Sequence, residues 1–152
     1  MKILVFSDSH RFLSGMVQAI EEEKPDQVIH LGDLMGDAEE LSWRFQTLPI
    51  CMVPGNCDGW TTAPAIKRIT LQGKNILLSH GHLWRVKGGY DLAIAEARKS
   101  GVDILLFGHT HRAYCQQLED GLWVMNPGAS RTSYGTILLE GDSISCTLTK
   151  LI

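Results

Sequence analysis

The sequence lacks the long apolar segments that membrane-spanning helices need. No apolar run reaches the roughly 18 to 20 residues required to cross a bilayer. Residues 1–6 read as a first strand and are too short for the apolar core of a signal peptide. We therefore expect a cytoplasmic protein without membrane contacts, and its 152 residues fit one domain spanning residues 1–152.

Cysteines are few and widely separated. The chain has four, none of them in a C-x-x-C pair, so the sequence predicts neither a disulfide framework nor a structural zinc site. Cys51 and Cys146 lie in apolar runs, and we predict that both are small core residues with free thiols.

Positive charge is sparse as well. Fourteen Lys and Arg face seventeen Asp and Glu, for a net charge of −3, and no basic cluster occurs. Proteins that hold nucleic acid through many phosphates carry a basic face, so we expect no stable nucleic-acid binding. The nucleophile motif G-x-S-x-G and the P-loop are missing too, which leaves those chemistries without support. A small phosphoester substrate is compatible with this low positive charge, because metal ions can hold it without a basic patch.

The order of apolar and amphipathic stretches is typical of an α/β domain. Strands are predicted at residues 3–6, 27–31, 50–53 and 103–107, helices at 13–23, 38–45 and 90–99, and a hairpin at 66–71 and 74–78. Shorter runs at 113–118, 122–125, 136–139 and 143–149 indicate antiparallel sheet in the last third of the chain. His30 lies inside its strand, and we predict a buried, hydrogen-bonded core histidine.

Five apolar runs end in short turns that carry Asp, Asn or His, and five of the six histidines lie in these turns. The ends of buried strands meet at one edge of a twisted sheet, where ligand sites form. Asp and His suit Mn, Fe or Zn. Their number exceeds the needs of one tetrahedral ion and suits two ions about 3.5–4 Å apart that share a carboxylate. The candidate metal ligands are Asp8, His10, Asp33, Asn56, His80, His109 and His111.

The order and spacing of these motifs resemble the calcineurin-like metallophosphoesterase superfamily, especially its small single-domain YfcE-like phosphodiesterases. The matching residues are Asp8-x-His10, Gly32-Asp33, Gly55-Asn56, His80-Gly81-His82, Gly108-His109-x-His111 and Asn126-Pro127-Gly128-Ala129-Ser130. The resemblance implies a mixed fold, α/β in the broad sense and α+β in the narrower classification. Its architecture would be a four-layer αββα sandwich, in which helices flank two packed mixed β-sheets.

The resemblance also implies how the ligands divide between two divalent metal ions. Asp8, His10, Asp33 and His111 would hold one ion, and Asp33, Asn56, His80 and His109 the other, so that Asp33 bridges them. Manganese is the first choice of metal, with iron, zinc, nickel or magnesium as alternatives. A hydroxide bridging the ions would attack a small phosphodiester in line. Relatives of this branch form homo-oligomers, so a dimer or tetramer is expected.

The catalytic assignment beyond the ligands stays open. Larger members of the superfamily place a histidine directly after the ligand Asn, whereas this chain has Cys57 followed by Asp58. A thiol is a weaker proton donor than an imidazolium, so substrates with good leaving groups should react best. His82 is a candidate for substrate contact or support of His80, and Asp58 for orienting a ligand histidine. A purely structural role is an equal alternative for both.

Two other functions are compatible with the resemblance. The same fold serves as a protein-interaction scaffold in the retromer subunit, whose metal site is impaired. Trp43, Trp60, Trp84 and Trp123 could form such an interaction surface, although packing in the core or at the site rim is the better explanation. The complete ligand set favours an enzyme. A metal-dependent nuclease is the third reading, and the missing basic channel weighs against it.

Overall fold

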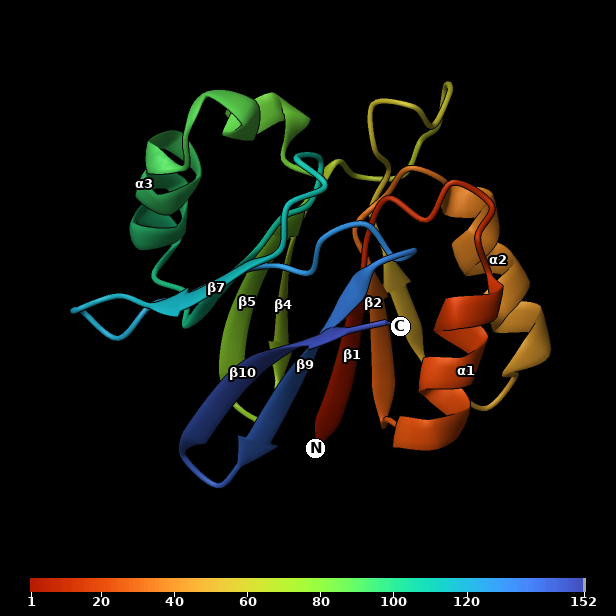
Figure 1. Ribbon diagram of the computed structural model, residues 1–152. Coiled ribbons are helices and arrows are strands. Elements are labelled where there is room, and N and C mark those ends of the chain that lie inside the picture. The colour runs from red at the N-terminus through yellow and green to blue at the C-terminus, as the bar shows by residue number, and fades with distance from the viewer. Residues whose placement is uncertain (152) are drawn as a thin grey trace.

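Two five-stranded mixed sheets pack face to face in the computed structural model, which describes residues 1–151 (Figure 1). The first sheet has the order β10-β9-β1-β2-β3. In it β1, β2 and β3 are parallel, β9 is antiparallel to β1, and β10 is antiparallel to β9. Its strands are β1 (Lys2–Phe6), β2 (Gln27–His30), β3 (Ile50–Met52), β9 (Ser133–Glu140) and β10 (Ser143–Lys150).

The second sheet has the order β4-β5-β6-β8-β7. The three central strands β5, β6 and β8 are parallel, while β4 and β7 pair antiparallel at the two edges. Its strands are β4 (Ile66–Leu71), β5 (Lys74–Ser79), β6 (Ile104–Leu106), β7 (Tyr114–Gln117) and β8 (Trp123–Asn126).

Helices cover the outer face of each sheet, which confirms the predicted four-layer sandwich. The helices α1 (Ser14–Glu23) and α2 (Met35–Arg44) pack on the first sheet, whereas α3 (Asp91–Ser100) lies beside the second (Figure 1). Two short 3-10 helices, His82–Trp84 and Val86–Gly88, continue the outer layer of the second sheet. Within residues 1–151, no helix combines the length and the apolar character needed to cross a bilayer.

The period of two along β1 explains how one strand serves two cores. Ile3 and Val5 point between the sheets and join the central cluster, which includes Leu78 and Leu106 of the second sheet. Leu4 and its alternate neighbours point the other way, against α1. Because both faces of β1 are covered, the strand reads as an uninterrupted apolar run.

The structure differs from the sequence-based prediction at the start of α2 and in the pairing of the C-terminal strands. The helix expected at 38–45 begins at Met35, ahead of Gly36, a residue that disfavours helix interiors; Asp37 lies in its first turn, where a carboxylate favours the positive end of the helix. The C-terminal strands do form antiparallel pairs, but the pairs separate: β9–β10 extends the first sheet and β7–β8 the second. One strand of each pair also hydrogen-bonds to another strand of the same sheet. β9 pairs antiparallel with β1, and β8 pairs parallel with β6.

Candidate metal centre

The turns that follow β1, β2, β3, β5 and β6 meet at one edge of the sandwich, the upper edge in Figure 1. Backbone hydrogen bonds join the turns within each sheet: Asp8 N–H donates to Gly32 O at 2.9 Å, and Gly108 N–H donates to His80 O at 2.8 Å. The two sheets are joined by His109 N–H, which donates to Asp8 Oδ2 at 3.0 Å. Turns from both sheets therefore build one site.

Five of the seven candidate ligands have left-handed backbone conformations. The φ angles are 53° at Asp8, 44° at His10, 45° at Asp33, 70° at His109 and 60° at His111. Residues with a side chain rarely adopt this region, which costs on the order of 1–3 kcal/mol each when it is strained. Such conformations persist where the surrounding structure holds them, and they concentrate at functional sites.

Two glycines allow the turns to approach one another closely. A Cβ atom at Gly55 would lie 2.0 Å from Asp33 Oδ1, and a Cβ at Gly108 would lie 2.0 Å from Ser7 Oγ. Both distances are far below van der Waals contact. Only glycine therefore fits at these positions without displacing a neighbouring turn.

Asp8 presents a buried carboxylate oxygen that has no hydrogen bond. Its Oδ2 accepts hydrogen bonds from the hydroxyl of Ser7, at 2.6 Å, and from His109 N–H. Its Oδ1 is buried and unpaired, 3.1 Å from His111 Nε2 and 3.6 Å from His80 Nε2. An unpaired buried carboxylate oxygen is costly, and this one faces two imidazole nitrogens, which together form a donor set that fits a divalent cation.

His80 is oriented with one ring nitrogen toward the carboxylates. Its Nδ1 lies 2.8 Å from Leu31 O, and because a carbonyl can only accept, Nδ1 carries the proton. In the neutral ring Nε2 then presents a lone pair, 3.4 Å from Asp33 Oδ2 and 3.2 Å from His109 Nδ1. A backbone carbonyl that fixes the tautomer in this way is typical of metal-binding histidines.

The charges of the site shift the pKa values of His80 and Asp33 in opposite directions. Burial opposes protonation of His80, but the hydrogen bond that the protonated ring donates to Asp33 and the charge of Asp8 raise its pKa overall. Burial also opposes ionisation of Asp33, yet the hydrogen bonds from His80 and from Cys57 hold its pKa well below the usual range. The two carboxylates thus favour a positive charge beside them. A bound cation would supply this charge in place of a proton on His80.

The donor atoms fall into two groups that share Asp8. Asp8, His10 and His111 form one group, and Asp8, Asp33 and His80 the other, with the atoms of each group within 4.8 Å of one another. The resemblance assigned the bridging position to Asp33. In this structure Asp8 belongs to both groups and Asp33 to one, and Oδ1 of Asp33 accepts the N–H of Cys57 at 2.8 Å.

Asn56 and Cys57 lie on the exposed side of the loop that follows β3. The amide nitrogen of Asn56 is 3.8 Å from Cys57 Sγ. The hydrogen bond between the thiol and Asp33 is the main cause that raises the pKa of Cys57, so the thiol remains protonated at neutral pH.

Asp58 lies behind the loop, and its hydrogen bonds go to backbone N–H groups rather than to a histidine. Its Oδ2 accepts from Asp33 N at 3.0 Å and from Gly55 N at 2.8 Å, and its Oδ1 accepts from Met35 N at 2.7 Å. Asp58 therefore holds the backbones of two ligand-bearing turns together.

His82 borders the second group of donors. Its ring centroid lies 5.6 Å from that of His80 and 6.2 Å from that of His109. Its Nδ1 is buried without a hydrogen bond, and burial lowers its pKa. The structure thus brings His82 to the rim of the centre.

The prediction for His30 is confirmed, because the ring is fully buried and hydrogen-bonded at both nitrogens. Gly32 N–H donates to Nδ1 at 3.1 Å, so Nε2–H donates to Ser9 Oγ at 2.9 Å. The Ser9 hydroxyl in turn donates to Asp37 Oδ2 at 2.6 Å. Burial lowers the pKa of His30 to about 4. Sequence reasoning did not identify Ser9 and Asp37, although the position of Ser9 between two ligands was a usable signal.

Two packed mixed sheets with Asp- and His-bearing turns at one edge define the class of small metallophosphoesterases. Residues 1–140 match the family described as the calcineurin-like phosphoesterase superfamily domain, and the chain belongs to this family. The chain is 34% identical to the probable metallophosphoesterase YsnB of Bacillus subtilis, over 94% of this chain and 87% of that protein.

Solved structures are similar over nearly the whole chain. Vps29 of Chaetomium thermophilum superposes with a TM-score of 0.82 at 23% identity, covering 99% of this chain and 89% of that one. YfcE of Escherichia coli, a phosphoesterase, gives a TM-score of 0.66 at 20% identity, covering 95% and 91%. At these identities the likeness shows the shared fold.

Proposed function

We propose that the protein is a metal-dependent phosphodiesterase that hydrolyses small phosphodiesters with two divalent metal ions. The observation that carries this proposal is the buried, unpaired Oδ1 of Asp8, which faces His80 and His111 where the two groups of donors meet. Membership of a phosphoesterase superfamily supports the same reaction class.

The residues that would hold the ions are those of the two groups, completed by Asn56 and His109. When bound, two such ions supply Lewis-acid activation of water and neutralise charge on the phosphoryl oxygens. Manganese is our first choice, with iron, zinc, nickel or magnesium as alternatives, because Asp, Asn and His ligands suit all of them. The hydrogen bond to Leu31 O fixes the ring of His80, and Asp58 fixes the backbone of Asp33, which supports this ligand set.

Proton transfer to the leaving group depends on the remaining polar residues. His82, on the rim, is the histidine available to contact a phosphoryl or leaving oxygen. Cys57 occupies the position after Asn56, but a thiol with a raised pKa is a weak donor to an alkoxide. Phosphodiesters with acidic leaving groups, such as bis(p-nitrophenyl) phosphate, should therefore react fastest.

The test is hydrolysis after the protein has been stripped of metal and refilled with single divalent ions. We expect Mn²⁺ to restore hydrolysis of bis(p-nitrophenyl) phosphate, and Asp33→Asn to lower kcat/KM by at least about 100-fold, since it removes a ligand charge. Asp142→Asn, on the exposed turn between β9 and β10, is the matched control and should retain full activity. Full activity of Asp33→Asn would refute the proposal.

A protein-interaction scaffold is the second candidate, and the likeness to Vps29 favours it. Trp43 and Trp60 are 78% and 92% exposed, whereas Trp84 is buried, so two of the four tryptophans are available to a partner. A scaffold would not hydrolyse any phosphoester, with or without added metal. Loss of partner capture in Trp60→Ser, with no measurable hydrolysis by the native protein, would favour this alternative.

A nuclease remains the least supported activity, and a cytoplasmic location and a homodimer or homotetramer remain predictions. Light scattering of the purified protein measures the last of these directly.

A further inference from the structure

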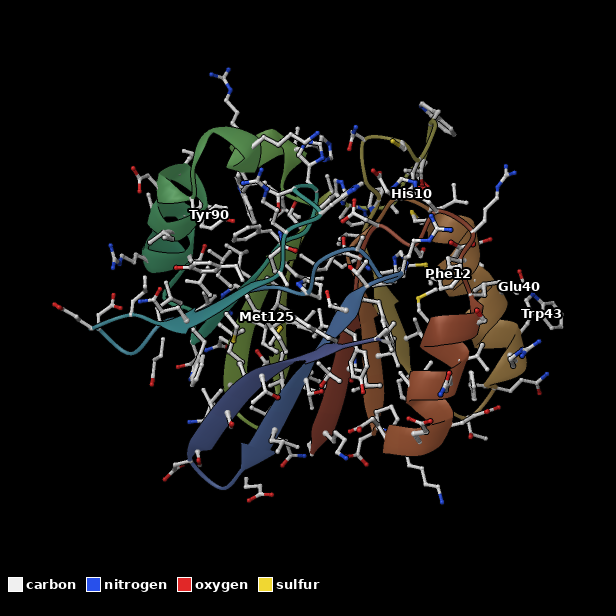
Figure 2. The ribbon with its side chains drawn as sticks, viewed as in Figure 1. His10, Phe12, Glu40, Trp43, Tyr90 and Met125 are labelled. Atoms are coloured by element: carbon white, nitrogen blue, oxygen red, sulfur yellow. The ribbon has the colours of Figure 1, made fainter. Side chains whose placement is uncertain are left out.

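A cavity of about 480 Å³ opens beside the metal centre. Its lining combines three candidate ligands with two arginines and an aromatic ring. The lining residues are Asp8, Ser9, His10, Arg11, Phe12, His111, Ala129 and Arg131. Figure 2 shows His10 and Phe12 near one another at the upper ends of α1 and α2. A substrate whose phosphate reaches the ligands could therefore extend into this cavity.

The two arginines of the cavity lack carboxylate partners. Among residues 1–151, salt bridges with arginine involve only Arg98, so neither Arg11 nor Arg131 is neutralised. Arg131 instead lies over the ring of Phe12, 5.2 Å from its centroid, a cation–π geometry that leaves the guanidinium hydrogen-bond donors available. Two unpaired guanidinium groups in one cavity are unexpected in a chain with a net charge of −3.

The backbones of both arginines are fixed relative to the centre. Arg131 follows Ser130, whose N–H and hydroxyl both donate to Ser7 O, at 2.9 and 2.8 Å. Ser7 directly precedes Asp8. Arg11 has a left-handed φ of 69°, and its N–H donates to Asp37 Oδ2 at 2.7 Å. The residue that follows the Asn126–Ser130 motif thus presents a guanidinium to the cavity.

We propose that this cavity binds a second anionic group of the substrate, a carboxylate or phosphate on the alcohol portion of the phosphodiester. The inference rests on the proposed function and narrows its substrate class. A guanidinium group pairs with a carboxylate or phosphate through two parallel hydrogen bonds, a geometry that neutral or cationic groups cannot match.

The test compares two non-hydrolysable ligands, 3-phosphonopropionate and propylphosphonate, which differ by one carboxylate. Calorimetry on the full-length, Mn²⁺-loaded protein gives a dissociation constant for each. We expect the carboxylate to tighten binding about tenfold. In Arg131→Gln and Arg11→Gln this ratio should fall toward one, while Arg44→Gln, whose arginine lies outside the cavity on α2, should keep it.

A tenfold ratio that persists in the Arg11→Gln/Arg131→Gln double variant would overturn the proposal, because the carboxylate would then be bound by the metal ions. A ratio of one in the native protein would overturn it as well. Hydrolysis of bis(p-nitrophenyl) phosphate is measured in parallel. Hydrolysis with a ratio of one refutes the anion-binding cavity alone, whereas a tenfold ratio without hydrolysis refutes the proposed catalysis and retains the cavity.

Discussion

The carboxylate of Asp58 accepts a hydrogen bond from the backbone N–H of Asp33, 3.0 Å away. The same oxygen also accepts the N–H of Gly55, so one side chain fixes two turns that each carry a ligand. The positions of the candidate ligands thus depend on a residue that need not touch any ion.

Replacing Asp58 by Asn should weaken both folding and metal binding. An amide group must turn its NH₂ toward at least one backbone donor, which leaves a partly buried N–H unsatisfied. We expect the metal-free protein to lose about 2 kcal/mol of unfolding free energy. Mn²⁺ affinity should fall about 10- to 100-fold, as for other residues that orient ligands. Urea unfolding and calorimetry measure the two effects, and a native-like Mn²⁺ affinity would contradict this role.

Two glycines in one loop allow the effect of close packing to be distinguished from the effect of backbone flexibility. Gly55→Ala places a Cβ against Asp33 Oδ1, whereas a Cβ at Gly59 meets nothing within 4 Å. We expect Gly55→Ala to lose about 1–3 kcal/mol of stability together with Mn²⁺ binding, because the clash involves a ligand. Gly59→Ala should change stability by less than about 0.5 kcal/mol. Equal stability and Mn²⁺ affinity in the two variants would show that the close approach is not required.

The shared position of Asp8 predicts an order among ligand variants. His111→Gln removes a donor from one group and should leave one ion tightly bound, whereas Asp8→Asn should remove both ions. Metal analysis after dialysis gives the number of ions per chain. His82→Gln is the matched histidine control and should retain both ions; loss of an ion in this variant would make His82 a ligand rather than a rim residue.

Buried His30 predicts a loss of stability in mild acid. Its folded-state pKa of about 4 lies below the ordinary value of 6.5, so the unfolded chain binds the proton more readily. Its contribution is complete above about pH 6.5 and disappears as the pH falls toward 4, amounting to about 2 kcal/mol between pH 7.5 and 5. Urea unfolding of the metal-free protein at both pH values measures the loss, and His30→Gln should reduce it by that amount. An unchanged pH dependence in the variant would contradict the assignment.

Much of the site was predictable because each candidate ligand lies in a short turn that follows an apolar run. The positions of Asp8, Asp33 and His80 followed from the rule that buried strand ends meet at one edge. Strand length was predicted less well: β9 begins at Ser133, ahead of its apolar segment, because β10 pairs with it as far as Ser133.

Contacts between distant segments could not be predicted from local pattern. Arg11 and Arg131 line one cavity because Ser130 hydrogen-bonds to Ser7, and no periodicity encodes that contact. The position of Asp8 in both donor groups likewise depends on how the second sheet packs, since His80 reaches Asp8 from β5.

The origin of the ligands has a consequence for the lifetime of the protein. Asp8 and Asp33 are carried by the first sheet, and His80 and His109 by the second. Cations at this edge would cross-link the two sheets of the sandwich. Depletion of metal would weaken the contact between the two sheets at this edge first. Proteases should then cut the turns around residues 56–62 and 109–112 sooner in a metal-starved cell, and the abundance of the protein would follow the metal supply.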